Sequence, residues 1–426
     1  MRWALVIMVL VCAAAGVAAP AGKKPRALPA LPVRFELVSD QVDVATIHGW
    51  NTCRLLKLDG ALYASGLAAR AEDDKTDNWA AQKGIVFRRS DDGKWRRIAG
   101  GLPRIYTWAA GAEGTVWAVA PSWYTNTHTY RSGKGPDFSA GAFKKVYDGT
   151  CSYEGVGASP EGNFLLLHAK SSNMKAGTAN AIVAAFWEQA AGKWHYSELP
   201  TPEGRYGYAG VIVRGNKALA VLQSSMEDPA ANPEPPHYSW RHVRLARCDD
   251  LTKGVWVSRR WLAPAYGATS LYDLVAAPDG CAYLSYLHAG ADTREALAKT
   301  PARHYIARIH DDLSTEVFAT GLQLDAARLV LDSKGGWHIV ARPALGGNLH
   351  LWTLDAATGF TAVKEYDLPG TESLKGYVLH TLNPGRFGGQ DDGDTIHIMS
   401  TNILRAPEGG KLNRAELWHA YFKLPS

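Results

Sequence analysis

The chain repeats one strand–turn–strand pattern seven times, and this repeat limits its possible folds more than any other feature. Each repeat places a short turn between two apolar strands, as in LLKLDGALYASG and VAAPDGCAYLSYLH. The seven turns carry Asp59-Gly60, Glu113-Gly114, Glu161-Gly162, Gly215-Asn216, Asp279-Gly280, Gly335-Gly336 and Asp392-Gly393. Glycine, common to all seven, readily adopts the positive φ angle that tight hairpins require. Because the repeats recur roughly every 45 to 60 residues, they match the blades of a β-propeller.

Further hairpins indicate that each blade holds more than two strands. The segments FRRSDDGKWRRI, AFWEQAAGKWHYSEL and LWTLDAATGFTAVKEY have alternating apolar residues on either side of a glycine turn. This pattern is typical of antiparallel strands. Helical periodicity is scarce, and residues 292–299 form the best short helix candidate. We therefore predict an all-β protein, a seven-bladed β-propeller of four-stranded blades.

The two ends of the repeat region predict how the ring closes. The last blade ends with AELWHAYFKLP as its third strand. Residues 33–38, VRFELV, can supply the missing outer strand of that blade. Pairing of the first and last segments in one blade leaves the ring without an open edge.

The first 32 residues differ from the repeats. Arg2 precedes an apolar run from Leu5 to Val11, and small residues lead to Ala19, which is the layout of a secretory signal peptide. The apolar run is too short to span a bilayer comfortably. Residues 20–32, PAGKKPRALPALP, are Pro-rich and basic, as a tether would be. We expect a signal peptide at 1–19, a linker at 20–32 and the propeller at 33–426. The protein would be secreted or periplasmic, without membrane insertion.

Composition limits the partners and cofactors. The 15 Trp, 18 Tyr and 42 Gly residues suit short strands joined by tight turns. The formal net charge is only +5 and its basic residues are scattered, which argues against nucleic acid as a partner. Cys53, Cys151, Cys248 and Cys281 could pair in an exported protein, but no CxxC or CxxH spacing indicates zinc. We expect a monomer without a cofactor or catalytic metal. A structural calcium ion stays open, although no loop has the required ligand spacing.

The propeller plan predicts where a binding site lies. Loops that enter the first strand and leave the second strand of each blade share one face, around the mouth of the central channel, and ligand sites usually use irregular loops of this kind. From these positions we select as catalytic candidates His48, His168 and Tyr208. The substrate-binding candidates are Trp50, Trp123, Arg205, Gln223, Arg241, His288 and Arg342. Segments 123–139 and 226–239 are expected to wall a cleft over blades two to four.

These residue types suit β-elimination next to a uronic acid. The reaction needs a group that neutralises the carboxylate, a base for the C5 proton and a proton for the leaving oxygen. In this hypothesis His48 or His168 acts as base or acid, and Tyr208 is the complementary proton carrier. The carboxylate contacts would be Gln223, Arg205 and Arg241, and the sugar-stacking rings would be Trp50 and Trp123.

An exported seven-bladed propeller with a histidine-centred site resembles the propeller polysaccharide lyases. These include the ulvan lyases and related enzymes that act on rhamnosyl-glucuronate ends. The resemblance covers the blade plan of the whole mature chain, and at residue level it rests on His48, Gln223 and Arg241. It implies a secreted carbohydrate-active enzyme, a polysaccharide lyase whose partner is an acidic polysaccharide or oligosaccharide.

Two other classes of function stay open. The same architecture carries non-catalytic modules that bind a glycan or a protein. A glycoside hydrolase could use Glu154 and Asp273 as its pair of carboxylates. A sialidase is disfavoured, because the Arg-Ile-Pro motif is absent even though residues 90–95, SDDGKW, resemble a shortened Asp-box turn.

Overall fold

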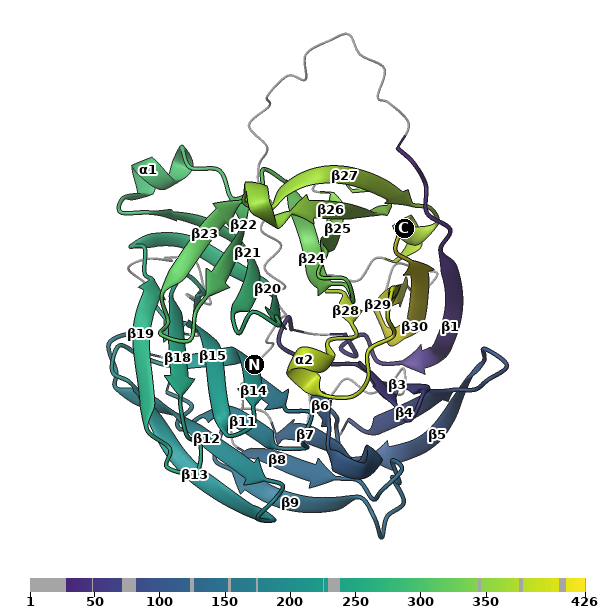
Figure 1. The fold of residues 1–426 in the computed structure, drawn as a ribbon. Helices are drawn as coiled ribbons and strands as arrows, with labels where there is room; N and C mark the ends of the chain where they lie inside the picture. The colour runs from purple at the N-terminus through teal and green to yellow at the C-terminus, as the bar shows by residue number, and fades with distance from the viewer. Residues whose placement is uncertain are drawn as a thin grey trace.

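The computed structural model confirms a seven-bladed β-propeller (Figure 1). It describes residues 28–47, 49–70, 82–122, 126–151, 155–173, 175–224, 226–228, 238–343, 346–374, 378–405 and 411–425. Seven antiparallel four-stranded sheets stand around a common centre. In blades one to six the strands follow chain order from the inner to the outer edge.

The first four blades occupy residues 55–262. Blade one comprises β2 (Leu55–Leu58), β3 (Ala61–Leu67), β4 (Gly84–Arg89) and β5 (Trp95–Leu102). Blade two comprises β6 (Thr107–Ala110), β7 (Val116–Ser122), β8 (Asn126–Arg131) and β9 (Lys144–Gly149). Blade three comprises β10 (Gly155–Ala158), β11 (Phe164–Ala169), β12 (Asn180–Glu188) and β13 (Lys193–Thr201). Blade four comprises β14 (Tyr206–Arg214), β15 (Lys217–Ser224), β18 (Val243–Cys248) and β19 (Trp256–Leu262).

The last three blades and the small elements complete the fold. Blade five comprises β20 (Tyr266–Ala276), β21 (Ala282–Ala291), β22 (Arg303–Ile309) and β23 (Thr315–Ala319). Blade six comprises β24 (Leu324–Leu331), β25 (Trp337–Pro343), β26 (Leu349–Asp355) and β27 (Thr361–Leu368). Blade seven comprises β28 (His380–Thr381), β29 (Thr395–Arg405), β30 (Lys411–Lys423) and β1 (Arg34–Val42). The other elements are β16 (Met226–Glu227), β17 (Tyr238–Ser239), α1 (Arg294–Ala298), α2 (Pro384–Phe387) and the 3-10 turns η2 (Ala112–Gly114), η3 (Ala356–Thr358) and η4 (Thr371–Ser373).

The predicted turns and helix candidate agree with this arrangement. The seven predicted glycine turns all lie between the first and second strands of a blade. In blade one, Asp59 and Gly60 have φ values of 48° and 79°, the left-handed conformation that such a turn needs. Helix α1 falls inside the predicted segment 292–299, and its N-cap Thr293 accepts a hydrogen bond from the Ala296 amide.

The seventh hairpin departs from the prediction, because a helical plug replaces a plain turn. Between β28 and β29 the chain forms α2, which lies over the middle of the ring (Figure 1). Phe387 bridges to Ala158 of blade three, and the Gln390 amide donates to the Lys57 carbonyl of blade one. The segment therefore crosses the channel and joins blades that are distant in sequence.

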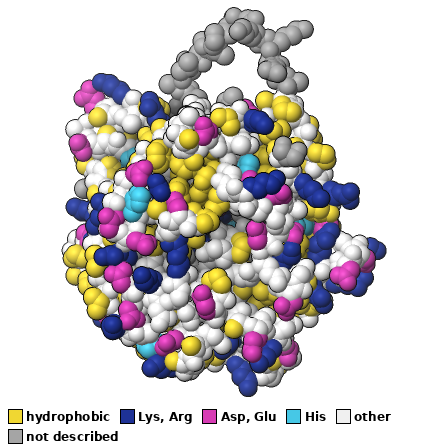
Figure 2. All heavy atoms as spheres, in the orientation of Figure 1, with side chains coloured by type: hydrophobic (Ala, Val, Ile, Leu, Met, Phe, Trp, Pro, Cys, Tyr) yellow, Lys and Arg dark blue, Asp and Glu magenta, His cyan; other side chains and the backbone are white. Residues whose placement is uncertain are grey.

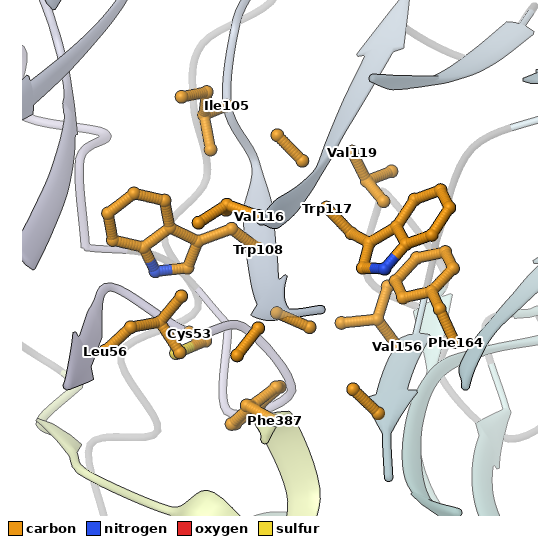
Figure 3. Close-up of a cluster of buried hydrophobic side chains, with 14 of the residues drawn as sticks. Cys53, Leu56, Ile105, Trp108, Val116, Trp117, Val119, Val156, Phe164 and Phe387 are labelled. Carbon is orange, nitrogen blue, oxygen red and sulfur yellow. The ribbon is translucent and has the colours of Figure 1, made fainter. Parts of the chain in front are cut away.

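Large aromatic side chains fill the space between neighbouring blades. Figure 3 shows Trp108 and Trp117 from the two inner strands of blade two, with Phe387 of α2 reaching the same cluster. Trp117 stacks on Phe164 of blade three at 4.8 Å between ring centroids. Both tryptophans are almost fully buried. Such aromatic side chains account for much of the apolar surface that is buried between the blades and stabilises the propeller.

The predicted closure by the N-terminal strand is confirmed. Strand β1 pairs with β30 from Arg34 opposite Tyr421 to Val42 opposite Ala415. Glu36 of β1 accepts hydrogen bonds from four donors on blades one and seven. These are Arg89 Nε (2.8 Å), Arg89 Nη2 (2.6 Å), Trp95 Nε1 (3.0 Å) and His419 Nδ1 (3.0 Å). The contact thus ties the first strand to the last blade and to the first.

We expect this closure to weaken in acid. Burial lowers the pKa of His419 from 6.5 to about 4. The unfolded chain therefore takes up a proton more readily than the folded one between these values, and stability falls as the pH falls from 6.5 towards 4. The loss from this residue should be on the order of 2 to 3 kcal/mol at pH 4.5. Urea unfolding at pH 7 and pH 4.5 should show a smaller acid loss for His419→Gln than for the wild type. Equal losses in the two proteins would contradict this account.

The start of the described chain lies on the propeller earlier than expected. The Asp367 amide of β27 donates to the Pro29 carbonyl, and the Leu31 amide donates to the Asp367 carbonyl. Residues 29–31 thus pair with the outer edge of blade six, within the segment predicted as linker. The predicted signal peptide at 1–19 lies outside the described residues. No helix in the described part of the chain is long and apolar enough to cross a membrane.

The four cysteines of the propeller form no disulfide bond with one another. Cys53, Cys151, Cys248 and Cys281 are all buried. Burial raises the pKa of Cys53 to about 12, so this thiol is not a nucleophile near neutral pH. The disulfides that export would permit are not formed among these residues.

Candidate functional site

Two of the predicted site residues, His48 and Trp123, lie outside the described residues. Among the others, the structure brings Tyr208, Gln223, Arg241 and His288 into one contact network between blades four and five. We call this network, together with Trp240 and Thr269, the blade four–five cluster. It lies at the start of β14, the end of β15 and the N-terminal half of β20, on the face that the repeat predicted.

Gln223 links the two blades through its side-chain amide. Its Nε2 donates to the Thr269 carbonyl of β20 and, at 3.3 Å, to the Trp240 carbonyl. The Thr269 amide also donates to the Trp240 carbonyl at 3.2 Å. Gln223 is 6% exposed and Thr269 is 1% exposed. The Gln223 amide nitrogen is therefore used by the fold, and its oxygen is the atom left for a ligand.

Thr269 determines which nitrogen of His288 carries a proton. The Thr269 hydroxyl donates to the Arg241 carbonyl at 3.1 Å. A hydroxyl has one proton, so the 2.9 Å contact between Thr269 Oγ1 and His288 Nδ1 requires Nδ1 to be the donor. His288 Nε2 then carries a lone pair, and it makes no hydrogen bond within the described residues. Because burial lowers the pKa of His288, the ring is neutral near pH 7 and Nε2 can accept a proton.

Arg241 brings a positive charge to the same place. Its Nη2 forms an ion pair with Asp228, and its Nε donates to His242 Nε2 at 3.1 Å. Its Nη1 is buried without a hydrogen-bond partner. Burial, together with the nearby charges of Arg241 and Arg260, lowers the pKa of His242 to about 4. The neighbouring imidazole is thus neutral, and the Nη1 donor of Arg241 is unused among the described residues.

Tyr208 is placed by a β-bulge. Gly207 pairs with Gln223 and Gly210 pairs with Val221, so Tyr208 and Ala209 together oppose Leu222. Tyr208 has a φ of 45°, an uncommon conformation for a tyrosine. Its ring is half-buried and contacts Trp240 edge-on at 5.2 Å between centroids. Bulges of this kind redirect a side chain next to functional sites, and here the ring is directed to the cluster.

Blade five forms the wall beside this cluster. Its inner strands β20 and β21 are 11 and 10 residues long, against 4 and 7 in blade one. Helix α1 follows β21, and Arg294 of α1 lies over the Tyr266 ring of β20 at 5.5 Å. The segment 123–139 was predicted as a loop over blades two to four, but β8 occupies 126–131 of it. Within 226–239 the described residues form the short β16–β17 pair.

His168 lies elsewhere and both of its ring nitrogens are engaged. It is 1% exposed, in β11 between blades two and three. Its Nδ1 donates to the Ala169 carbonyl at 3.0 Å, so its Nε2 accepts from the Tyr147 hydroxyl at 2.9 Å. Burial lowers the pKa of His168. The predicted base thus has its lone pair occupied, and we assign it a structural contact between blades.

Three predicted ligand-binding residues are likewise used by the fold. Trp50 is 8% exposed, and its ring packs against the Arg386 guanidinium, at 5.1 Å, instead of offering a free stacking face. Arg205 is fully buried, and its Nη1 donates to the Ser172 carbonyl at 3.5 Å. Arg342 of β25 donates to the Leu374 carbonyl between blades six and seven. These positions were selected because they lie at blade entrances or exits, where packing residues are equally frequent.

The predicted hydrolase pair is not supported at this face. Glu154 lies outside the described residues, and Asp273 is 2% exposed beside Arg328. No group of three or more metal-ligating side chains was found in the described part of the chain. A hollow of about 690 Å³ lies instead between the outer parts of blades three and four, lined by Glu188, Lys193, His195, Asn216, Asp249, Asp250 and Thr252. Its carboxylates Glu188 and Asp250 are paired with His195 and Lys253.

On the face drawn in Figure 2, surface charge does not indicate a binding site. In the face drawn in Figure 2, Lys and Arg are interspersed with Asp and Glu. A mixed surface does not focus one sign of charge, so recognition depends on individual groups such as Arg241.

No family model and no curated protein sequence matches the chain. A PL25 ulvan lyase bound to -[GlcA(1-4)Rha3S]- is 8% identical over 90% of this chain and 95% of its own, with a TM-score of 0.57. The polysaccharide lyase Uly1 is 11% identical over 93% of this chain and 100% of its own, with a TM-score of 0.50. The chain resembles these lyases in architecture. The α-L-arabinofuranosidase Arb93A from Fusarium graminearum is 14% identical over 91% and 97%, with a TM-score of 0.46. At these identities the likeness concerns the fold.

Sequence reasoning missed the residues that organise the cluster. Thr269 and Trp240 were not selected, although Thr269 contacts Arg241, Gln223 and His288. A threonine within a strand is ordinary in sequence, and no spacing signal distinguishes it. His242 could have been found, because it adjoins Arg241 in the chain.

Proposed function

We propose that the protein is a carbohydrate-active enzyme, a polysaccharide lyase that cleaves by β-elimination next to a uronic acid in an acidic glycan. One observation carries the proposal. A proton acceptor, a hydroxyl and a cation, namely His288, Tyr208 and Arg241, belong to one network that Trp240 and Thr269 connect between blades four and five. Elimination needs these three chemical types at one place. The architectural likeness to polysaccharide lyases agrees with this conclusion.

The proposed roles account for each proton and each bond in the elimination. Arg241 binds the uronate carboxylate and makes the C5 proton more acidic, while the Gln223 amide oxygen accepts a hydrogen bond from a sugar hydroxyl. The predicted carboxylate contact of Gln223 is not retained, because its amide nitrogen is used by the fold. His288 Nε2 takes the C5 proton, the C4–O4 bond breaks, and a C4=C5 double bond forms. Tyr208 donates a proton to the departing O4 and regains one from solvent. His48 remains a predicted catalytic residue and Trp123 a predicted stacking residue, both outside the described part of the chain.

The deciding assay is ultraviolet absorbance of the unsaturated uronate, followed while the full chain is incubated with a panel of acidic polysaccharides. A rise in absorbance supports elimination. New reducing ends without that rise would instead indicate a glycoside hydrolase. Saturable binding without either product would favour a binding module that recognises a glycan or a protein. Tyr208→Phe and His48→Ala should each reduce the absorbance rate if these side chains carry protons.

The activity should persist into mild acid. Burial lowers the pKa of His288 below 6.5, and the base acts in its neutral form. Activity is therefore present above the folded-state pKa and is lost as the pH falls through it. We expect the acid limb of the kcat/KM profile below pH 6.5. An acid limb above that value would contradict the assignment of His288 as the base.

The cellular setting follows the same proposal. An enzyme for polymeric glycans acts where these polymers occur, so we propose export to the periplasm or the medium. We further propose that it acts as a monomer and without a cofactor.

A further inference from the structure

The centre of the propeller contains three buried arginines. Arg54 and Arg386 are fully buried and Arg328 is 4% exposed. They come from the entrance of blade one, from α2 and from β24, which are far apart in the chain. Burying a guanidinium away from water is costly unless its charge and its donors are satisfied.

The chain segment 50–54 holds these arginines together. Arg328 Nη1 donates to the Trp50 carbonyl at 3.1 Å, and Arg386 Nη2 donates to the Asn51 carbonyl at 3.1 Å. Arg54 belongs to the same segment, and its Nη1 donates to the Ile105 carbonyl at 2.6 Å. Arg328 and Arg386 therefore bind carbonyls of consecutive residues, whereas Arg54 extends to Ile105 at the entrance of blade two.

The negative charge within this cluster is too small to balance it. Asp273 is buried 3.7 Å from Arg328 Nη1, and it also lies in the field of Arg386. Burial raises the pKa of Asp273, which disfavours even this one negative charge. His380 is buried close enough to all three arginines for their charges, together with burial, to lower its pKa well below 6.5. The imidazole is therefore neutral, and at least two positive charges remain uncompensated among these residues.

Many donors of the three side chains are also unused. Within the described part of the chain, five guanidinium nitrogens are buried without a hydrogen-bond partner: Arg54 Nε and Nη2, Arg328 Nη2, and Arg386 Nε and Nη1. His380 Nε2 and Trp50 Nε1 are buried and unpartnered as well. Stacking of the Arg386 guanidinium on Trp50 and Phe387, at 5.1 and 4.6 Å, stabilises its charge but satisfies none of its N–H groups.

We propose that this cluster is a binding site for a small inorganic anion, such as chloride, held between Arg328 and Arg386 under the α2 plug. The anion would compensate the buried charge and accept the unused N–H groups. Because α2 covers the site and no arginine of the cluster is appreciably exposed, the anion is a structural component of the propeller. The proposal is independent of the reaction at the blade four–five cluster.

Thermal unfolding of the full chain tests the proposal. Chloride is titrated against a bulky sulfonate buffer anion at constant ionic strength, so that general screening stays fixed. A ligand bound only by the folded state raises Tm with a saturable dependence on its concentration. We expect a rise of a few degrees that saturates, and a similar rise with bromide. A Tm that does not respond to chloride or bromide at constant ionic strength overturns the proposal, since buried water would then satisfy the donors.

Variants and crystals test whether the chloride-dependent rise in Tm comes from the proposed site. Arg386→Met should lower the chloride-dependent rise in Tm at least twofold, whereas Arg214→Met, at a partly exposed arginine on blade four, should leave it unchanged. A response lost equally in both variants would overturn the assignment. If Arg386→Met does not fold, crystals grown in bromide decide between the outcomes. An anomalous peak within hydrogen-bonding distance of the Arg328 and Arg386 guanidiniums supports the site, and a peak only elsewhere contradicts it.

Discussion

His288→Ala should lower kcat/KM for the cleaved glycan by roughly 10² to 10⁴-fold, the usual contribution of a positioned base. The substitution removes the Nε2 lone pair, which no described residue occupies. The ring is only partly buried and makes one side-chain hydrogen bond, to Thr269, so the fold should tolerate its loss. The initial rate of absorbance increase and the Tm of the same preparation measure both effects.

Two variants separate a catalytic role from a general effect. His310→Ala removes another blade-five histidine, which is paired with Glu316 at the outer turn, and should keep full activity. Thr269→Val keeps the shape but removes the hydroxyl that accepts from His288 Nδ1. As a positioning residue, Thr269 should alter the pH profile as well as the rate, because the tautomer is no longer fixed. Full activity in a folded His288→Ala protein would refute His288 as the base.

Glu36→Ala should destabilise the protein by about 2 to 4 kcal/mol, because it leaves Arg89 and His419 without their shared acceptor. Although burial alone would raise the pKa of Glu36, hydrogen bonds from Arg89 and His419 outweigh it and lower that pKa to about 2. The side chain is 15% exposed, so solvent can replace these bonds only in part. Urea unfolding near pH 7 should show the loss as a lower midpoint.

A second acidic residue of the same strand supplies the control. Asp40 pairs with Arg414 at 3.0 Å, but both side chains are considerably exposed. Asp40→Ala should therefore change the stability by less than about 1 kcal/mol. Equal losses for Glu36→Ala and Asp40→Ala would mean that the closure does not depend on the buried network.

The blade plan could be predicted because its determinants are local. Each hairpin combines an alternating apolar strand with a glycine at a turn, and neighbouring residues decide both. Asp59-Gly60 and the other predicted turns accordingly lie between the first and second strands of their blades. The closing strand was predictable for a related reason, since a blade with three strands leaves an unpaired edge.

The site was predicted only in part. The position of a residue in its blade does not show whether its side chain belongs to the site or packs within the fold. Gln223, Arg241, Tyr208 and His288 occupy predicted positions and contact one network. Trp50, Arg205 and His168 occupy similar positions, yet packing and carbonyl contacts engage them. The local sequence is similar in both groups. Whether a side chain is engaged depends on the residues that the neighbouring blade places against it.

The sequence by itself determined the architecture: seven hairpin units, all-β blades and a ring closed by residues from both ends. Only the tertiary structure decided that α2 plugs the channel, that Arg328 and Arg386 meet beneath it, and that Thr269 orients His288. The physical reason is the distance along the chain between the residues that interact. Turns and strand alternation depend on adjacent residues, whereas burial, proton position and charge balance depend on side chains that only ring closure brings into contact.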